Sequence, residues 1–218
     1  MNRDALSGVL LIGSALAFIL VMGMHPTAHG LMKEETFQQT ARLGMLVHAL
    51  AIAATPVAFL GLLGVARRLW PSDLAAAALV ACGFGSVAVM GAALASGFVF
   101  PGVVSRIVAT EGSNVPHAFM LYTGLWNQAF AKVHVVAYAV GILLWSAAIL
   151  RSRGGMAFAT ATGISGIVVG IGVLFLFLSG HVHLDVHGSR IVWFAQSGWL
   201  VWLGITMLMA PPDDRVVT

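Results

Sequence analysis

The sequence predicts an all-α polytopic membrane protein with six transmembrane helices in a single domain, residues 1–218. Of its 218 residues, 59% are hydrophobic and only 9% are charged, whereas soluble domains carry about 25% charged residues. The mean hydropathy is +0.95, and a soluble fold of this size could not bury so much apolar surface. Six stretches approach the roughly 20 apolar residues that a helix needs to cross a bilayer. They span 5–24, 43–64, 74–99, 130–150, 156–179 and 190–210.

Polar or helix-breaking segments separate the first three helices. The first, 5–24, is expected to be a helix rather than a signal peptide. Its apolar stretch exceeds the usual ~7–15 residues, and no A-x-A-like site follows it. The second, 43–64, lies between "HPTAHG" and "ARRLWPSD", and the third, 74–99, ends at "FPG". Proline and glycine in these segments are typical of helix ends and turns.

The second half of the chain has a similar organisation. The fourth helix, 130–150, ends at "RSRGG", the fifth, 156–179, follows directly, and the sixth, 190–210, ends at "APPDDR". The segments 46–68 and 132–153 also resemble each other, because each has a histidine near its start, a small and apolar run, and a closing arginine pair. We therefore expect helices 2–5 to form a four-helix core, with helices 1 and 6 flanking it.

Positive charge predicts the orientation of the chain. Arginine and lysine in short loops favour the cytoplasmic side. Arg67, Arg68, Arg151 and Arg153 crowd into two very short loops, which lie on the same side as both termini. We therefore expect cytoplasmic N- and C-termini in a bacterial inner (plasma) membrane. The basic residues do not form the clustered stripe of a nucleic-acid-binding protein, so no nucleic-acid partner is expected.

All eight histidines fall at or near the opposite, outer end of the helices. His48 lies about one and a half turns into helix 2, and His134 lies just inside helix 4, at the matching position of the internal repeat. Ionisable side chains inside a membrane segment are costly and usually face the interior of the bundle. Two imidazoles from facing helices suit the axial positions of a haem or metal centre. The alternative is that each ring only hydrogen-bonds a neighbouring helix.

A second candidate site is the loop "SGHVHLDVHG". Its three histidines and one aspartate suit Zn²⁺, Cu²⁺ or Fe²⁺ better than Mg²⁺ or Ca²⁺, and two histidines after helix 1 could complete the site. The candidate metal ligands are His181, His183, His187, Asp185, His25 and His29. The alternatives are a polar loop that happens to be rich in histidine, or a lid that becomes charged at roughly pH 6.

Two basic residues are further candidates for the site, and several missing residue types and motifs limit the possible functions. Arg106, in the long outer loop, and Lys132, just before His134, are candidates to bind a haem propionate, an anionic substrate or a lipid headgroup. The six spans contain no acidic residue, and the chain has no Gly-rich phosphate loop, G-x-S-x-G, H-E-x-x-H or C-x-x-C motif. Without membrane-embedded acids, an ion-coupled transporter with a midplane site is disfavoured.

Six helices with both termini inside, together with His48 and His134, resemble the transmembrane cytochrome b-561 family. The resemblance implies a haem b held near the outer surface by histidines of helices 2 and 4. It also implies electron exchange with quinol or a small reductant such as ascorbate. That family holds a second, inner haem through helices 3 and 5, and those helices contain no histidine here. A single haem could not by itself pass electrons across the whole bilayer.

These observations favour an integral membrane redox protein, an oxidoreductase or electron carrier, with a histidine-ligated haem b or transition metal (Cu, Zn or Fe) near the outer face. Two other hypotheses stay open at this point. One is a copper- or zinc-binding transport or homeostasis protein, and the other is an accessory subunit of a larger membrane complex. The expected partners are the lipid bilayer, quinol or a small reductant, and a second copy of the chain or a larger complex.

Overall fold

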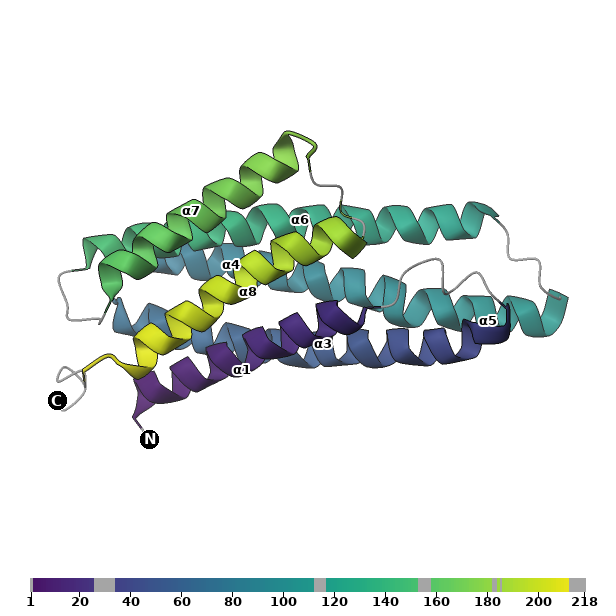
Figure 1. Ribbon diagram of the computed structural model, residues 1–218, viewed down its shortest axis with the longest axis horizontal. Helices are drawn as coiled ribbons and strands as arrows, with labels where there is room; N and C mark the ends of the chain where they lie inside the picture. Colours follow the sequence, from purple (N-terminus) through teal and green to yellow (C-terminus); the bar gives the residue numbers. More distant parts are fainter. Residues whose placement is uncertain are drawn as a thin grey trace.

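The computed structural model describes residues 2–25, 34–111, 117–152, 158–181, 184 and 186–211. Every regular element within these residues is a helix. In chain order they are α1 (Arg3–Met24), α3 (Glu34–Arg68), α4 (Asp73–Leu94), the π-helical turn η1 (Ala95–Val99), α5 (Phe100–Glu111), α6 (His117–Arg151), α7 (Ala159–Leu178) and α8 (Val186–Leu208). Six helical units in the described part of the chain are long and apolar enough to cross a membrane. The predicted all-α membrane protein is therefore confirmed (Figure 1).

Two helices extend well beyond their expected apolar spans. α3 and α6 each have 35 residues, which is about 52 Å of helix, whereas the hydrocarbon core of a bilayer is about 30 Å thick. They begin at Glu34 and His117, upstream of the expected starts at 43 and 130. A hydropathy pattern marks only the apolar part of a helix, so the expected spans did not include the polar first turns of these two helices. In Figure 1, α3, α5 and α6 run past the ends of α1 and α8.

The helical path also continues through "FPG", where the sequence predicted a stop. At η1 the N–H of Phe100 donates to the carbonyl of Ala95, five residues back. This wider turn precedes Pro101, which has no N–H to donate, at the start of α5. A π turn within a longer helix often marks a functional site, and Gly97 of this one packs against His48.

The six membrane helices are arranged as a closed ring. Each one packs against the next along the chain, and α1 packs against α8 to close the ring. In Figure 1, α1 and α8 lie along each other over much of their length. The packing differs in one respect from the expected core of helices 2–5. α1 and α8 help to enclose the interior, while α7 contacts only α6 and α8 among its major neighbours. Apolar composition alone gives no information about which helices meet.

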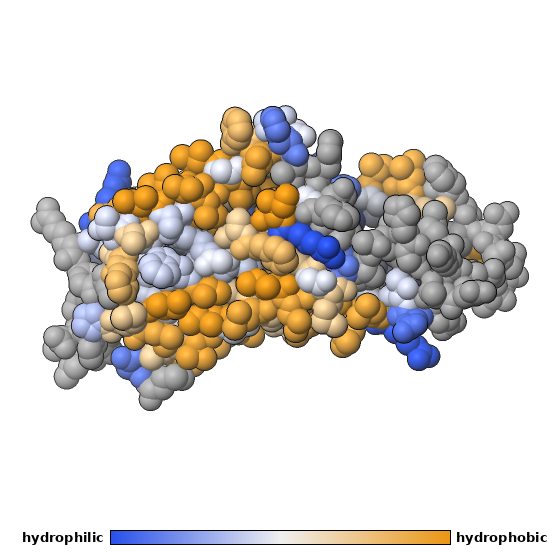
Figure 2. Space-filling model, viewed as in Figure 1, coloured by the Kyte–Doolittle hydropathy of each residue, from blue (hydrophilic) through white to orange (hydrophobic). Residues whose placement is uncertain are grey.

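The outward faces of the helices are apolar. Figure 2 shows hydrophobic residues over α1 and α7. The exposed large apolar residues of α7 recur every three or four positions: Ile164, Val168, Ile171, Phe175 and Leu178. Its opposite face carries small residues, and Cβ atoms placed on Gly163 and Gly170 would collide with Leu150 and Leu143 of α6. Small residues at helix contacts and large apolar ones toward lipid are typical of membrane bundles.

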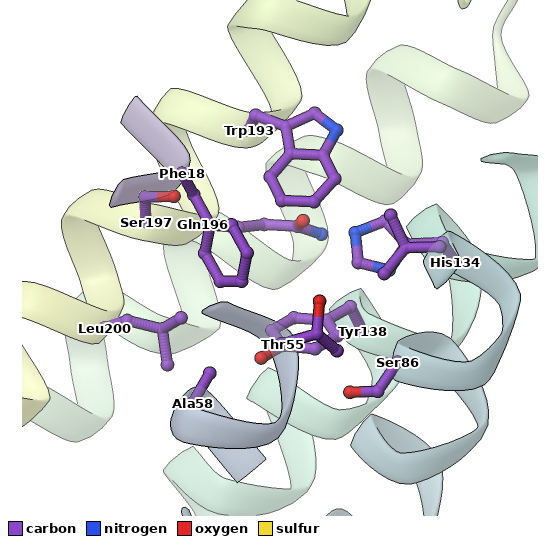
Figure 3. A pocket seen from close by; sticks show the side chains of 11 residues that line it. Phe18, Thr55, Ala58, Ser86, His134, Tyr138, Trp193, Gln196, Ser197 and Leu200 are labelled. Atoms are coloured by element: carbon purple, nitrogen blue, oxygen red, sulfur yellow. The ribbon is translucent and has the colours of Figure 1, made fainter. Parts of the chain in front are cut away.

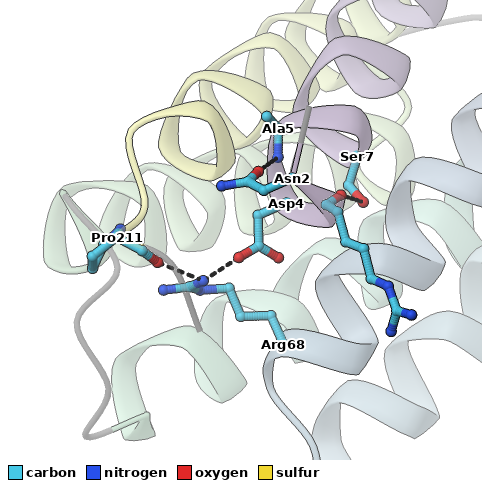
Figure 4. Close-up of polar contacts among 7 residues, drawn as sticks. Asn2, Asp4, Ala5, Ser7, Arg68 and Pro211 are labelled. Atoms are coloured by element: carbon cyan, nitrogen blue, oxygen red, sulfur yellow. Dashed lines mark hydrogen bonds and ion pairs between the residues drawn. The ribbon is translucent and has the colours of Figure 1, made fainter. Parts of the chain in front are cut away.

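The end of the bundle that holds both Asp4 and Pro211, here called the terminal end, is tied by one arginine. The Arg68 guanidinium bonds the carboxylate of Asp4 and, at 3.1 Å, the carbonyl oxygen of Pro211 (Figure 4). It thereby joins α3 to the start of α1 and to the chain after α8. Further into the bundle from this tie lies a fully buried apolar cluster, with Leu11, Leu62, Ile142, Trp145 and Leu203 among its members.

Candidate functional site

A cavity of about 200 Å³ lies between five helices at the opposite end of the bundle, where α1 ends and α8 begins. This end is called the histidine end below. Residues of α1, α3, α4, α6 and α8 line the cavity. Small side chains form much of its wall, namely Ala51, Ala92, Ala93 and Ala131. Its polar lining consists of His25, His48, Asn127, Gln128, His134 and Ser189. The two histidines that the sequence singled out within helices 2 and 4 therefore meet at one cavity.

His48 reaches the cavity from α3 and is 9% exposed. Its Nδ1 lies 2.6 Å from the carbonyl oxygen of Gly44, one turn earlier in the same helix. On the other side, η1 approaches the ring very closely. A Cβ placed on Gly97 would lie 2.4 Å from the Cβ of His48, which is closer than nonbonded carbon atoms can come. Glycine at this position therefore allows the π turn to pack against His48.

His134 reaches the cavity from α6 and is 3% exposed. Its Nδ1 lies 2.9 Å from the carbonyl oxygen of Gly85 on α4, so the ring is anchored to a neighbouring helix. Trp193 of α8 stacks on the imidazole with ring centroids 4.8 Å apart, and Tyr138 lies 5.1 Å away. The Nε2 atom of His134 is buried and has no hydrogen-bond partner among the described residues.

The two backbone contacts determine which ring nitrogen carries the proton. A carbonyl oxygen only accepts hydrogen bonds, so Nδ1 must be the donor in both His48 and His134. In a neutral imidazole this leaves the lone pair on Nε2. A histidine that binds a metal through one nitrogen almost always donates its other ring N–H, often to a backbone carbonyl. Both rings therefore have the hydrogen bonding that a ligating histidine needs.

His25 is a third imidazole at the cavity. It follows the last turn of α1, and its ring lies edge-on to that of His48 with centroids 5.0 Å apart. Arg190 of α8 donates from Nε to the carbonyl of Met22 at 3.0 Å, and from Nη2 to that of His25 at 3.4 Å. These bonds satisfy carbonyls at the C-terminal end of α1, which have no partner within the helix. They hold the end of α1 against α8.

Below His134, toward the terminal end, lies a smaller chamber. It is lined by residues of α1, α3, α4, α6 and α8 and has free space of about 10 Å³. Five polar side chains join His134 in its wall: Thr55, Ser86, Tyr138, Gln196 and Ser197 (Figure 3). His134 and Trp193 line both the chamber and the larger cavity.

The other predicted site residues are not brought to this cavity. Arg106 on α5 and Lys132 on α6 are exposed, and neither lines the cavity. Their binding of a haem propionate, an anionic substrate or a lipid headgroup stays a prediction. His181 follows α7 and is exposed, with Nδ1 2.7 Å from Oγ of Ser179.

The rest of the predicted loop site cannot be placed. His29, His183, Asp185 and the side chain of His187 lie outside the described residues. Within the part of the chain that is described, no three His, Cys, Asp or Glu side chains are grouped so that they could hold a metal ion. A metal site in the loop stays a prediction.

Sequence reasoning missed several residues that shape the site. Gln196 had a readable signal, because it is the one amide within the apolar helix that contains "VWFAQSGWLVW". Gly97 and Trp193 had none, since glycine and tryptophan are common in membrane helices and at their ends. Their roles follow from which helices meet.

No family model matches this chain, and neither does any curated protein or solved structure. The resemblance to the cytochrome b-561 family stays a prediction. The site must therefore be interpreted from its own geometry.

Proposed function

We propose that this chain is an integral membrane redox protein that binds a haem b or a transition-metal centre through His48 and His134. The observation that carries the proposal is that both imidazoles lie at one cavity and have the same hydrogen-bonding arrangement. Each donates its Nδ1–H to a backbone carbonyl, which leaves the lone pair of the neutral ring on Nε2, and both residues line the cavity. A purely structural histidine would be expected to use both ring nitrogens in hydrogen bonds when it is buried, and Nε2 of His134 makes none.

The donor set favours haem over a bare ion. Structural and catalytic zinc sites use at least three protein ligands, and no such group of three is found among the described residues. A haem brings four nitrogen ligands of its own, so two imidazoles complete its coordination. When bound, a haem would supply reversible one-electron exchange.

The protein's own residues would hold and insulate such a centre. The bond from His134 to Gly85 fixes one ring to α4, and the bond from His48 to Gly44 fixes the other to α3. The apolar cluster around Trp145 and Leu203 closes the bundle toward the terminal end. Electron exchange would therefore occur at the histidine end, with quinol or a small reductant as the partner. With the termini in the cytoplasm, as the charge pattern predicts, this end faces outward.

The proposal is tested by the visible spectrum of the protein. The chain is produced in cells supplied with iron and a haem precursor, purified in detergent, and measured as a reduced-minus-oxidised difference spectrum. We expect the bands of a low-spin haem with two histidine ligands. His48→Ala and His134→Ala should each abolish that spectrum, whereas the matched control His181→Ala, at an exposed histidine, should retain it.

Two results would contradict the proposal. Haem bands that survive both His48→Ala and His134→Ala would show that other residues hold the centre. Protein that purifies without haem, does not take it up on titration, and contains no stoichiometric metal by elemental analysis would remove the redox function altogether. A stoichiometric metal without haem bands would instead replace the haem by a metal ion at the same two histidines.

A further inference from the structure

Two buried polar atoms face each other across the chamber below His134. Nε2 of Gln196 and Nε2 of His134 are both buried, and neither has a hydrogen-bond partner among the described residues. The two residues are 2% and 3% exposed. In Figure 3 the side-chain amide of Gln196 and the imidazole of His134 point toward each other. Buried polar groups in proteins are nearly always satisfied, by protein or by ordered water.

The two atoms have complementary chemistry. Because His134 donates from Nδ1 to the carbonyl of Gly85, its Nε2 in the neutral ring can only accept a hydrogen bond. The amide nitrogen of Gln196 can only donate. No direct bond joins them, so the partner between them must accept from one and donate to the other. A hydroxyl group does both.

The size of the chamber selects the ligand. Its free space is about 10 Å³, and a cavity holds a single water molecule from roughly 10–15 Å³ when two to four polar groups surround it. Thr55 supplies a further partner, because its Oγ1 donates to the carbonyl of Ala51 at 2.8 Å and keeps lone pairs to accept.

We propose that the chamber binds one water molecule, which accepts a hydrogen bond from Nε2 of Gln196 and donates one to Nε2 of His134. This site concerns the ligand-free protein and does not rest on the proposed redox function. It does have a consequence for it. The lone pair of His134 Nε2 can accept from the water or coordinate a centre, but not both at once. The water therefore occupies the ligating atom until a ligand displaces it.

The test is nuclear magnetic resonance of the ligand-free full chain in detergent micelles, with ¹⁵N-labelled histidine and glutamine side chains. We expect a cross-relaxation peak between the side-chain amide protons of Gln196 and water, with the sign of a long-lived bound molecule. The ¹⁵N shift of His134 Nε2 should be that of a hydrogen-bond acceptor. In Gln196→Leu this shift should move toward the value of an unbonded nitrogen. Gln128→Leu, which removes an amide from the larger cavity only, should leave it unchanged.

Each other outcome overturns the proposal. A coupling through a hydrogen bond between Nε2 of Gln196 and Nε2 of His134 would show that the two side chains bond directly. Absence of both the water peak and that coupling would show a dry chamber. If Gln196→Leu does not fold, the measurements on the unmodified chain decide alone.

Discussion

Gly97 and His48 are in such close contact that a single added carbon atom on Gly97 would lie 2.4 Å from Cβ and 2.6 Å from Cγ of His48. Gly97 belongs to the π turn η1, and His48 to the cavity wall on α3. The irregular turn and the candidate ligand are therefore positioned against each other. The position of His48 therefore depends on the absence of a side chain at Gly97.

We expect Gly97→Ala to displace His48 and to reduce stability by about 1–3 kcal/mol, the usual effect of overpacking a tight interior. Haem or metal uptake should fall with it, since the His48 ring cannot keep its place. The measurement is thermal unfolding of the purified protein in detergent, combined with the difference spectrum. Gly172→Ala on α7 is the matched control, because a Cβ there meets nothing within 4 Å. Equal stability of the two variants would contradict the packing described here.

A second prediction concerns the tie at the terminal end. Arg68 and Asp4 form an ion pair with each other, and their side chains are only 8% and 15% exposed. Loss of one partner therefore leaves the other charge poorly solvated. Arg68→Met should therefore lower the free energy of unfolding by about 3 kcal/mol. The exposed neighbour Arg67 provides the control, and Arg67→Met should have little effect.

A double variant separates the ion pair from its surroundings. If the two charges stabilise each other, Asp4→Asn combined with Arg68→Met should be less destabilising than the sum of the single changes. Strict additivity would indicate that Arg68 acts mainly through the carbonyl of Pro211, which it also bonds.

The membrane class and the six spans could be predicted because the bilayer imposes a length and an apolar composition that are visible in one dimension. The convergence of His48 and His134 could be predicted for a related reason. Ionisable groups inside a span face the interior, and the repeat placed these two at matched depth. Both line one cavity in the structure, while their role as ligands stays a prediction.

The remaining features depend on contacts between helices. When every helix is apolar on most sides, the sequence does not indicate that α1 packs against α8, or that α7 lies outside the cavity. Arg106 and Lys132 are candidates from their position in the chain alone, and only the structure shows that both are exposed and that neither lines the cavity. Hydropathy likewise gave no indication of the π turn at Gly97, which is a matter of backbone geometry.

A third prediction decides which of the cavity's three histidines are ligands. His25 contacts His48 edge-on with centroids 5.0 Å apart, but it follows the last turn of α1 rather than lying within a membrane helix. We expect His25→Ala to keep the two-histidine spectrum that His48→Ala and His134→Ala lose. Loss of the spectrum in His25→Ala, with retention in His48→Ala, would show that the ligand on this side is His25.

The last prediction joins the two proposals at Gln196. If a water molecule occupies Nε2 of His134 in the ligand-free protein, a ligand must first remove it. Gln196→Leu deprives that water of one hydrogen bond, whose net worth is typically about 0.5–1.5 kcal/mol. Haem titrated into the ligand-free protein should therefore bind roughly twofold to twelvefold more tightly to this variant. Gln128→Leu is the control, because its amide already donates to the carbonyl of Leu184 at 2.7 Å and does not reach the chamber. A similar gain in both variants would attribute the effect to a more apolar cavity, and weaker binding in Gln196→Leu would mean that Gln196 supports the bound ligand directly.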